Sequence, residues 1–274
     1  MKKLQIITGG TSGMGLDTAR ILGGFGPVFI GGRNAKRLDD ALAVLKKAGV
    51  EAYGSQCDVS DIGSVKAFAK AAAEIAPISN VVNAAGVDFD TSTNEQMVHI
   101  NMVGTINVTE TFLPLMTEGT LLNFSSITGY FYTPQAAEFE VWNEPNSADF
   151  ANKCLELIAQ QPNPMQGRLP DTYICYCATK RFVIYYTMAN ASRFGAKGLR
   201  VISIAPGSFN TPMLETQKEY LDSIAAGTAF KRVGEPDEMS NLIKALLDPK
   251  ISYLTGCDIV MDGGKHALVT VKQL

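Results

Sequence analysis

The sequence has little histidine: its 274 residues include only His99 and His266. A hydrolase of the Ser-His-Asp type needs a histidine base, so that class has little support here. Cysteine is sparse too, with five residues at positions 57, 154, 175, 177 and 257. An odd and sparse set in so long a chain is typical of a reducing compartment, which predicts a cytoplasmic protein. Cys175 and Cys177 have the wrong spacing for a zinc knuckle, so we expect no metal site.

The sequence also lacks a long apolar run and an excess of basic charge. No apolar stretch reaches the length of a membrane span, so no membrane partner is expected. The apolar start ends at once in Thr8-Gly9-Gly10, which favours a first strand over a signal peptide. Lysine and arginine number 24 against 27 aspartates and glutamates, a net charge of −3, which does not predict binding of nucleic acid through a basic surface. Hydrophobic residues make up 46%, enough for a sizeable core.

A glycine-rich segment follows the first predicted strand, Leu4–Thr8. It reads Thr8-Gly-Gly-Thr-Ser-Gly-Met-Gly15 and leads into a predicted helix. Glycines at 9, 13 and 15 permit a tight turn and close backbone approach, and a helix N-terminus favours a phosphate. The spacing is T-G-x-x-x-G-x-G rather than G-x-G-x-x-G, but both patterns predict a dinucleotide site. The alternative is an ordinary glycine turn between a strand and a helix.

Strands and helices alternate along the rest of the chain. This alternation predicts an α/β fold, a Rossmann-type doubly wound parallel sheet of about seven strands with helices on both faces. Since no linker, internal repeat or low-complexity segment is visible, we expect residues 1–274 to form a single domain. The further predicted strands span residues 27–31, 52–56, 78–82, 121–124, 199–205 and 258–261.

Arg33 bears on the choice between NADP and NAD. An acid at the end of the second strand would bind the ribose 2′-hydroxyl of NAD, whereas an arginine there accommodates the 2′-phosphate of NADP. Here Gly32-Arg33-Asn34 follows the strand and no acid is present. NADP(H) is therefore the preferred cofactor, with NAD(H) possible. The alternative is that Arg33 is an ordinary solvated loop charge.

Tyr176 and Lys180 are four residues apart, so they project from one face of a predicted helix. A tyrosine titrates near pH ~10, and a cation beside it favours the phenolate and lowers its pKa. Such a pair can take a proton from an alcohol or give one to a ketone near neutral pH. Alone the pattern is weak, because it occurs by chance on many helices.

Five motifs in order resemble the short-chain dehydrogenase/reductase family over nearly the whole chain. The first is the glycine-rich segment 8–15, and the last four are Asn83-Ala-Ala-Gly86, Asn101-x-x-Gly104, Tyr176-x-x-x-Lys180 and Pro206-Gly207. The resemblance implies that Tyr176 is the acid/base, that Lys180 lowers its pKa and binds the nicotinamide ribose, and that Ser126 hydrogen-bonds the substrate oxygen. It implies that Asn101 holds a water in a proton relay.

The resemblance also implies a set of cofactor contacts. Asp58 and Val59 would lie at the adenine and Thr211 near the carboxamide, while Arg33 matches the family's NADP-preferring pattern. The remaining expected contacts are Gly9, Thr11, Ser12, Gly13, Met14, Gly15, Asn83, Ala84, Ala85, Gly86, Lys180, Pro206 and Gly207.

One departure from compact members of the family is an insertion at about residues 130–172, between Ser126 and Tyr176. It contains a predicted helix at 147–161, and carbonyl reductases of this family also carry an insertion here. Three roles are open: it caps the substrate pocket, it obstructs the family's usual helix-pair dimer contact, or it is a surface embellishment. A homo-oligomer is expected by family habit, and the insertion puts its usual contact in doubt.

The substrate prediction rests on apolar bulk in two segments. If these side chains face the nicotinamide, the pocket suits a bulky apolar ketone or secondary alcohol such as a hydroxysteroid; alternatively, they pack their own elements against the sheet. Rival interpretations are a reductase of small carbonyl compounds, a nucleotide-sugar epimerase and a non-enzymatic NADP-binding regulator. The epimerase is disfavoured by the glycine spacing, and the regulator by the complete catalytic set. The apolar residues are Tyr130, Phe131, Tyr132, Phe139, Trp142, Phe209, Met213, Leu214 and Tyr220.

Overall fold

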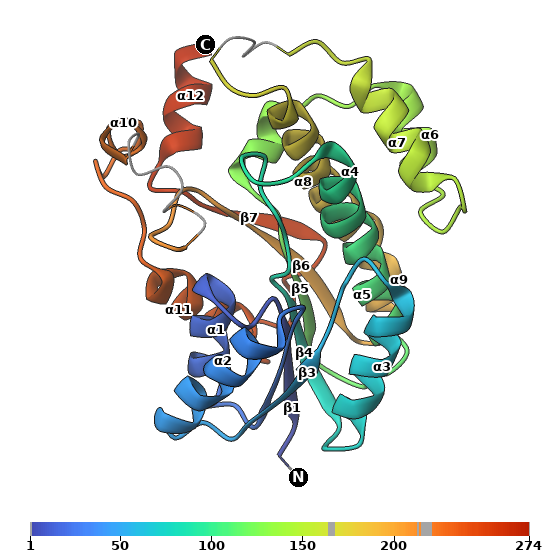
Figure 1. The fold of residues 1–274 in the computed structure, drawn as a ribbon, viewed down its shortest axis with the longest axis vertical. Helices are drawn as coiled ribbons and strands as arrows, with labels where there is room; N and C mark the ends of the chain where they lie inside the picture. The colour runs from blue at the N-terminus through green and yellow to red at the C-terminus, as the bar shows by residue number, and fades with distance from the viewer. Residues whose placement is uncertain (1, 164–167, 213, 215–220, 274) are drawn as a thin grey trace.

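The computed structural model describes residues 2–163, 168–212, 214 and 221–273. A seven-stranded sheet lies at its centre, in the order β3-β2-β1-β4-β5-β6-β7 with every neighbouring pair parallel (Figure 1). The predicted Rossmann-type fold is confirmed, and no predicted strand end differs from the observed one by more than one residue. The strands are β1 (Leu4–Thr8), β2 (Val28–Gly32), β3 (Ala52–Gln56), β4 (Ile78–Asn83), β5 (Thr120–Phe124), β6 (Arg200–Pro206) and β7 (Cys257–Met261).

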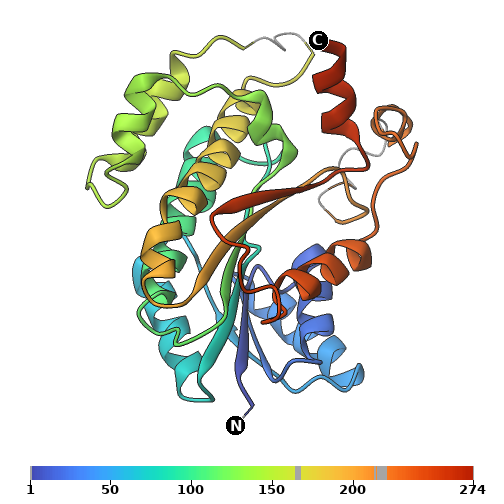
Figure 2. The same cartoon turned by 180° about the vertical axis from the view of Figure 1, so that it is seen from behind.

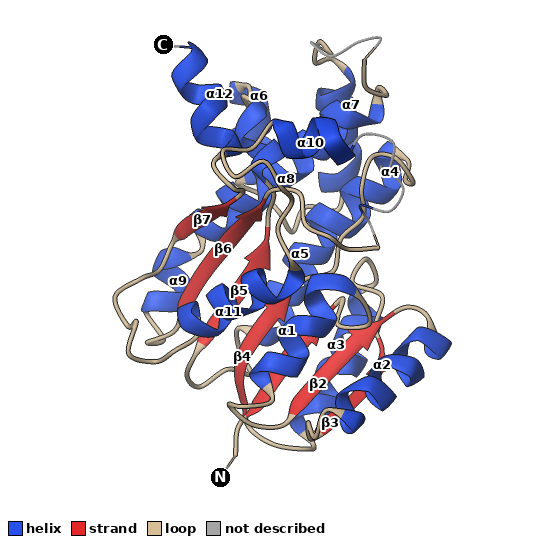
Figure 3. Ribbon diagram, turned by 90° about the vertical axis from the view of Figure 1, so that its left-hand side faces the viewer, coloured by secondary structure: helices blue, strands red, loops and turns tan. Residues whose placement is uncertain are grey.

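Helices cover both faces of the sheet (Figure 3). One face carries α1 (Gly13–Leu22), α2 (Ala35–Lys47) and α11 (Pro236–Leu246), and the other carries α3 (Ile62–Ala73), α5 (Gly104–Phe112) and α8 (Thr172–Ala189). Central strands of such a sheet are buried on both faces, and every residue of β1 and β5 is buried, including the polar Gln5 and Asn123. The shorter helices are α4 (Asn94–Met97), η1 (Val98–Val103), η2 (Ile127–Phe131), α9 (Ala191–Gly195), α10 (Leu221–Ala226) and α12 (Lys265–Gln273).

The alternation of side chains along β1 divides the core into two layers. Leu4 and Ile6 pack with Phe68 and Phe112 on the α3 and α5 side. Ile7 faces the opposite layer, under α1, α2 and α11. Since all strands run the same way, their carboxyl ends meet at one edge, which is where α/β proteins of this type bind ligands. In the part of the chain described, no helix is long and apolar enough to cross a membrane.

The insertion at 130–172 forms two helices, α6 (Ala136–Trp142) and α7 (Phe150–Ala159), beside α8 (Figure 2). The predicted helix at 147–161 corresponds to α7, and α6 was not predicted. Trp142 is buried, with its ring centroid 5.6 Å from that of Phe182 on α8. Phe150 of α7 lies 5.4 Å from the same ring. The apolar sides of both inserted helices are therefore used in packing against α8.

Candidate active site

Tyr176 and Lys180 lie together on α8, as their spacing predicts. The Nζ atom of Lys180 is 5.8 Å from the centroid of the Tyr176 ring. Lys180 is 6% exposed, and its Nζ donates to the carbonyl oxygen of Phe124, at the end of β5, over 3.0 Å. The lysine therefore connects the catalytic helix to the carboxyl edge of the sheet.

Ser126 follows β5 and is the N-cap of η2. Its Oγ accepts hydrogen bonds from the backbone N–H of Thr128 (3.2 Å) and the hydroxyl of Thr128 (3.0 Å), which leaves its own proton free to donate. The Ser126 hydroxyl lies near Tyr176 and acts to lower the pKa of that phenol. Gly129 lets η2 lie close against α8, because a Cβ at this position would be only 2.9 Å from the backbone nitrogen of Arg181.

The electrostatics of Tyr176 differ from the prediction. Burial raises the pKa of Tyr176, and the charge of Asp88 adds to this rise. Burial also lowers the pKa of Lys180, from 10.5 to about 8. The expectation that Lys180 depresses the pKa of Tyr176 is wrong for this structure, because the ammonium is itself desolvated and is directed at Phe124. A neutral phenol at Tyr176 is a proton donor.

Asn101 lies in the π-helical turn η1, where the wider turn leaves its backbone carbonyl to accept from the Thr105 hydroxyl over 2.7 Å. Its side-chain Oδ1 accepts from the N–H of Val87 (3.0 Å), and its Nδ2 donates to the carbonyl oxygen of Val87 (3.1 Å). A Cβ on Gly86 would lie 3.3 Å from Asn101 Oδ1 and 3.4 Å from Lys180 Nζ. Asn101, Ser126, Tyr176 and Lys180 are thus gathered at one place.

A cavity of about 290 Å³ lies beside these residues, at the carboxyl ends of the neighbouring strands β1 and β4. Most of the predicted cofactor residues line it. The lining residues are Gly9, Thr11, Ser12, Gly13, Met14, Gly15, Gly32, Arg33, Asn34, Arg37, Cys57, Asp58, Val59, Ala84, Ala85, Gly86, Val87, Ile100, Phe124, Thr211 and Pro212.

The end of the cavity that the glycine-rich segment forms fits the phosphates of a dinucleotide. Gly9 has φ +66°, and a Cβ there would lie 2.6 Å from the backbone of Ala84 and Ala85, so only glycine allows this close approach. Ser12 is the N-cap of α1 but makes no side-chain cap hydrogen bond. The N–H groups of the first turn are therefore left for an anionic ligand.

The opposite end of the cavity is basic. Arg33 follows β2, and Arg37 lies one helical turn further on, where its N–H donates to the Asn34 side chain over 2.9 Å. Within the described residues, neither guanidinium forms an ion pair. Sequence reasoning identified Arg33 but missed Asn34 and Arg37. The four-residue spacing of the two arginines at a helix start was the available signal.

Four predicted cofactor residues, Asn83, Lys180, Pro206 and Gly207, are not among the lining residues. The amide of Asn83 is buried, where its Oδ1 accepts from the Thr8 hydroxyl (2.7 Å) and its Nδ2 donates to Asn123 (3.2 Å). Asn83 therefore links β1, β4 and β5. Pro206 ends β6, and the N–H of Gly207 donates to the carbonyl oxygen of Met261 on β7.

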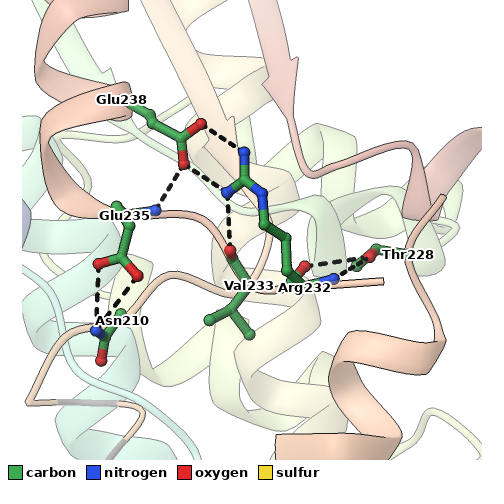
Figure 4. Close-up of polar contacts among 6 residues, drawn as sticks. All are labelled: Asn210, Thr228, Arg232, Val233, Glu235 and Glu238. Carbon is green, nitrogen blue, oxygen red and sulfur yellow. Dashed lines mark hydrogen bonds and ion pairs between the residues drawn. The ribbon is translucent and has the colours of Figure 1, made fainter. Parts of the chain in front are cut away.

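A polar network anchors the segment that brings Thr211 to the cavity (Figure 4). Asn210 donates to the carboxylate of Glu235, and its N–H donates to the carbonyl oxygen of Gly234 over 2.8 Å. Glu238 accepts from the N–H of Glu235 and from both terminal nitrogens of Arg232. These contacts fix the Thr211 segment to the start of α11.

Several of the residues that were predicted to line an apolar pocket pack against their own elements instead. The rings of Phe139 and Trp142 pack against α8 beside Tyr185, Tyr132 donates to buried Glu138, and Phe209 belongs to the core under α1 and α11. Met213 and Tyr220 lie outside the described residues.

Phe89 is an aromatic neighbour of Tyr176, and Tyr173 packs on Phe89 in turn. The Phe89 ring centroid lies 5.5 Å from that of Tyr176 and 5.1 Å from that of Tyr173. The Thr172 hydroxyl donates to the carbonyl oxygen of Phe89 over 2.7 Å, which fixes this loop to the start of α8. Sequence reasoning missed Phe89, although it follows the Asn83-Ala-Ala-Gly86 motif by three residues.

Comparisons with known proteins agree with this arrangement. A family model described as "short chain dehydrogenase" matches residues 3–139, and one described as "Enoyl-(Acyl carrier protein) reductase" matches residues 165–266. The chain therefore belongs to the short-chain dehydrogenase/reductase family, whose members are NAD(P)-dependent oxidoreductases.

Several relatives match over almost their whole length. A short-chain dehydrogenase/reductase of Alternaria brassicicola, bsc3, is 27% identical over 98% of each chain. Cis-4-hydroxycyclohexanecarboxylate dehydrogenase of Sinomonas cyclohexanicum is 26% identical over 97% of this chain and 98% of that one. A structure of actinorhodin polyketide ketoreductase with NADPH superposes with a TM-score of 0.76, covers 97% of each chain and is 24% identical. This last likeness supports the fold.

Proposed function

We propose that this protein interconverts a ketone and a secondary alcohol with NADP(H), and that its substrate is bulky and apolar, of the hydroxysteroid kind. The observation that carries the reaction type is the gathering of Ser126, Tyr176, Lys180 and Asn101 at one place. Because all four members of the set are present, an enzyme is favoured over a non-enzymatic NADP-binding regulator.

The chain's own groups divide the chemistry among themselves. The bound nicotinamide cofactor supplies or accepts the hydride. Tyr176, kept as a neutral phenol by burial, donates a proton to the carbonyl oxygen of the ketone, which favours the direction of reduction. Ser126 donates a second hydrogen bond to the same oxygen and stabilises the charge that develops there. Asn101 holds the turn after Gly86 through its two bonds to Val87, and Lys180, whose Nζ lies beside Gly86, would bind the nicotinamide ribose.

The cofactor would lie along the cavity, with its phosphates at the N-terminus of α1 and its adenosine ribose beside Arg33 and Arg37. Two cations without ion-pair partners among the described residues suit a 2′-phosphate. Asp58 and Val59, which also line the cavity, would meet the adenine. These contacts support a preference for NADPH over NADH.

The substrate preference is supported by Phe89 and Tyr173. A ketone bound to Tyr176 must pass close to these two rings, which offer an apolar wall with edge-on geometry. A cyclic or polycyclic ketone would cover that wall, whereas a small aliphatic carbonyl compound would leave it exposed to solvent. Reduction of small carbonyl compounds is the alternative.

We further propose a single domain over residues 1–274, a cytoplasmic location and a homo-oligomer. The five cysteines are free and four of them are buried, as suits a reducing compartment. Because α6 and α7 pack on α8 through Trp142 and Phe150, a dimer contact through that face of α8 is disfavoured. A different surface would join the subunits.

A panel of ketones tests the proposed function. Oxidation of NADPH and of NADH would be followed with substrates from small aliphatic to steroidal ketones. We expect turnover of bulky cyclic ketones with NADPH, and weaker turnover with NADH. Turnover of small ketones alone would contradict the apolar wall, and tight NADPH binding with no turnover across the panel would favour the regulator.

A further inference from the structure

A carboxylate on the edge strand lies behind the loop of the catalytic serine. Asp258 on β7 is the register partner of Ser203 on β6. Its Oδ1 accepts from the hydroxyls of Ser203 (2.5 Å) and Ser125 (2.6 Å), and its Oδ2 accepts from the hydroxyl of Tyr130 (2.8 Å). Over residues 2–163, 168–212, 214 and 221–273, no cation forms an ion pair with this carboxylate. Three neutral hydroxyls therefore solvate it.

Two of the three donors stand on either side of Ser126. Ser125 precedes it directly, and Tyr130 lies in η2, the turn that Ser126 caps. The pairing of β5 with β6 ends at Phe124 and Ile204, and the backbone N–H of Ser125 makes one further bond to Ile204, so the sheet no longer fixes the chain beyond Ser125. The bonds to Asp258 begin where the ladder stops.

The Ser125 hydroxyl has one proton and two acceptors within reach. It lies 2.8 Å from the carbonyl oxygen of Ile204 and 2.6 Å from Asp258 Oδ1. The Ile204 oxygen already accepts the backbone N–H of Ser125 over 2.9 Å. Because the charged carboxylate is the stronger acceptor, the Ser125 hydroxyl donates its hydrogen bond to Asp258. Burial and the negative charge of Asp258 raise the pKa of Tyr130, which keeps that hydroxyl a donor as well.

We propose that Asp258 is a positioning residue for the catalytic serine: by binding Ser125 and Tyr130 it holds Ser126 near Tyr176. This role rests on the proposed reductase function, although the anchoring itself does not. Ring packing extends this network to α12, because the centroid of the Tyr130 ring lies 4.7 Å from that of His266. The edge strand and the C-terminal helix thus bear on the geometry of the active site.

Ser203 provides a matched control. Its hydroxyl binds the same Oδ1 and is fully buried, but the residue lies within the ladder, paired to Asn123 on one side and to Asp258 on the other. Losing it removes a buried hydrogen bond without releasing the Ser126 turn. If the network around Asp258 had only a structural role, loss of the Ser125, Tyr130 or Ser203 hydroxyl would have the same effect on catalysis.

The test compares kcat, KM and the NADPH dissociation constant in Ser125→Ala, Tyr130→Phe, Asp258→Ala, Asp258→Asn and Ser203→Ala, with a ketone that the wild type turns over. We expect Asp258→Ala, and the double variant S125A/Y130F, to lower kcat by about 10- to 100-fold with NADPH affinity unchanged. Asp258→Asn should recover most of kcat, because its amide oxygen still accepts from both serines and its NH2 group can donate to the Tyr130 oxygen. Ser203→Ala should keep kcat within about twofold of the wild type.

Wild-type kcat in S125A/Y130F, or an equal loss in Ser203→Ala, would overturn the proposal. Should Asp258→Ala fail to fold, S125A/Y130F still decides it. Hydrogen exchange at the amides of Thr128 and Gly129, which donate to Ser126 Oγ and O, needs no substrate. Faster exchange in S125A/Y130F but not in Ser203→Ala supports the anchor, and unchanged exchange contradicts it, even if no ketone proves to be a substrate.

Discussion

The side-chain amide of Asn101 donates to the hydroxyl of Thr179 over 3.2 Å, and that hydroxyl donates to the carbonyl oxygen of Tyr176 over 2.8 Å. This relay connects the π-helical turn η1 to the backbone of the catalytic helix. Asn101, Thr179 and Tyr176 all lie at the candidate site, but neither of these bonds involves the Tyr176 phenol. The position of Tyr176 therefore depends on a buried hydroxyl that does no chemistry.

Thr179→Val should weaken both stability and catalysis. The substitution keeps the shape of this fully buried side chain but removes one of the acceptors of the Asn101 amide. A lost buried hydrogen bond costs about 1–3 kcal/mol, measurable as a lower urea midpoint. We expect kcat to fall while the NADPH dissociation constant is kept, and Thr179→Ser to restore both stability and kcat. An equal loss in Thr179→Ser would contradict the relay.

Lys180→Met should change how stability depends on pH. The folded-state pKa of Lys180 is about 8, below the 10.5 of an exposed lysine, so between these values the folded protein binds fewer protons than the unfolded chain. Wild-type stability therefore gains from this group as pH rises from about 8 to 10.5, by an amount of order 3 kcal/mol at most. The variant lacks this gain.

The measurement is the difference in free energy of unfolding between Lys180→Met and wild type, taken from urea titrations at several pH values. This difference should favour the variant most below pH 8 and should decline toward pH 10.5. A difference that stays constant with pH would show that Lys180 is not desolvated. Lys244→Met is a suitable control, since that lysine is exposed on α11.

Arg33→Ala and Arg37→Ala should each weaken NADPH binding by about tenfold while leaving NADH binding nearly unchanged, because only NADPH carries the 2′-phosphate. Lys36→Ala is the matched control: it removes a charge from the same turn, but Lys36 pairs with Asp40 and does not line the cavity. Dissociation constants from fluorescence titration check this. Equal weakening by all three substitutions would indicate a general charge effect, and tighter NADH than NADPH binding in the wild type would contradict the preference.

Trp142→Ala should destabilise the fold by about 3–5 kcal/mol, because the ring is buried between Phe139, Phe182 and Tyr185. At a temperature where the variant stays folded, we expect unchanged NADPH affinity, since none of the insertion's described residues lines the cofactor cavity. Tyr253→Ala, at a fully exposed ring, should change stability by less than about 0.5 kcal/mol. A Trp142→Ala variant as stable as wild type would contradict the packing described.

The fold followed from the sequence because two kinds of signal agreed. Buried parallel strands read as short apolar runs, and the glycines after β1 marked the turn into α1. The insertion was harder. Its helix α7 had an apolar side that could be seen, whereas α6 spans only seven residues and contributes Trp142 to a cluster whose other members come from several elements, among them η1, α7 and α8. Such a cluster is a tertiary property.

In the candidate site, too, some residues could be predicted from the sequence and others could not. Tyr176, Lys180 and the residues of the glycine-rich segment could be named from spacing. The roles of Phe89 and Asp258 could not, because Phe89 acts through its packing on α8 and Asp258 through contacts that join residues 125, 130, 203 and 258. The pKa of Tyr176 was predicted in the wrong direction, since burial cannot be read from a four-residue spacing.

The most direct test of the central claim is the single-turnover rate of ketone reduction by the preformed NADPH complex of Tyr176→Phe, beside wild type. Phenylalanine keeps the ring against Phe89 and removes only the proton donor. We predict a rate lower by about 10²- to 10⁴-fold with an unchanged NADPH dissociation constant. A rate within about twofold of wild type would show that another group supplies the proton and would contradict the assignment of Tyr176 as the acid.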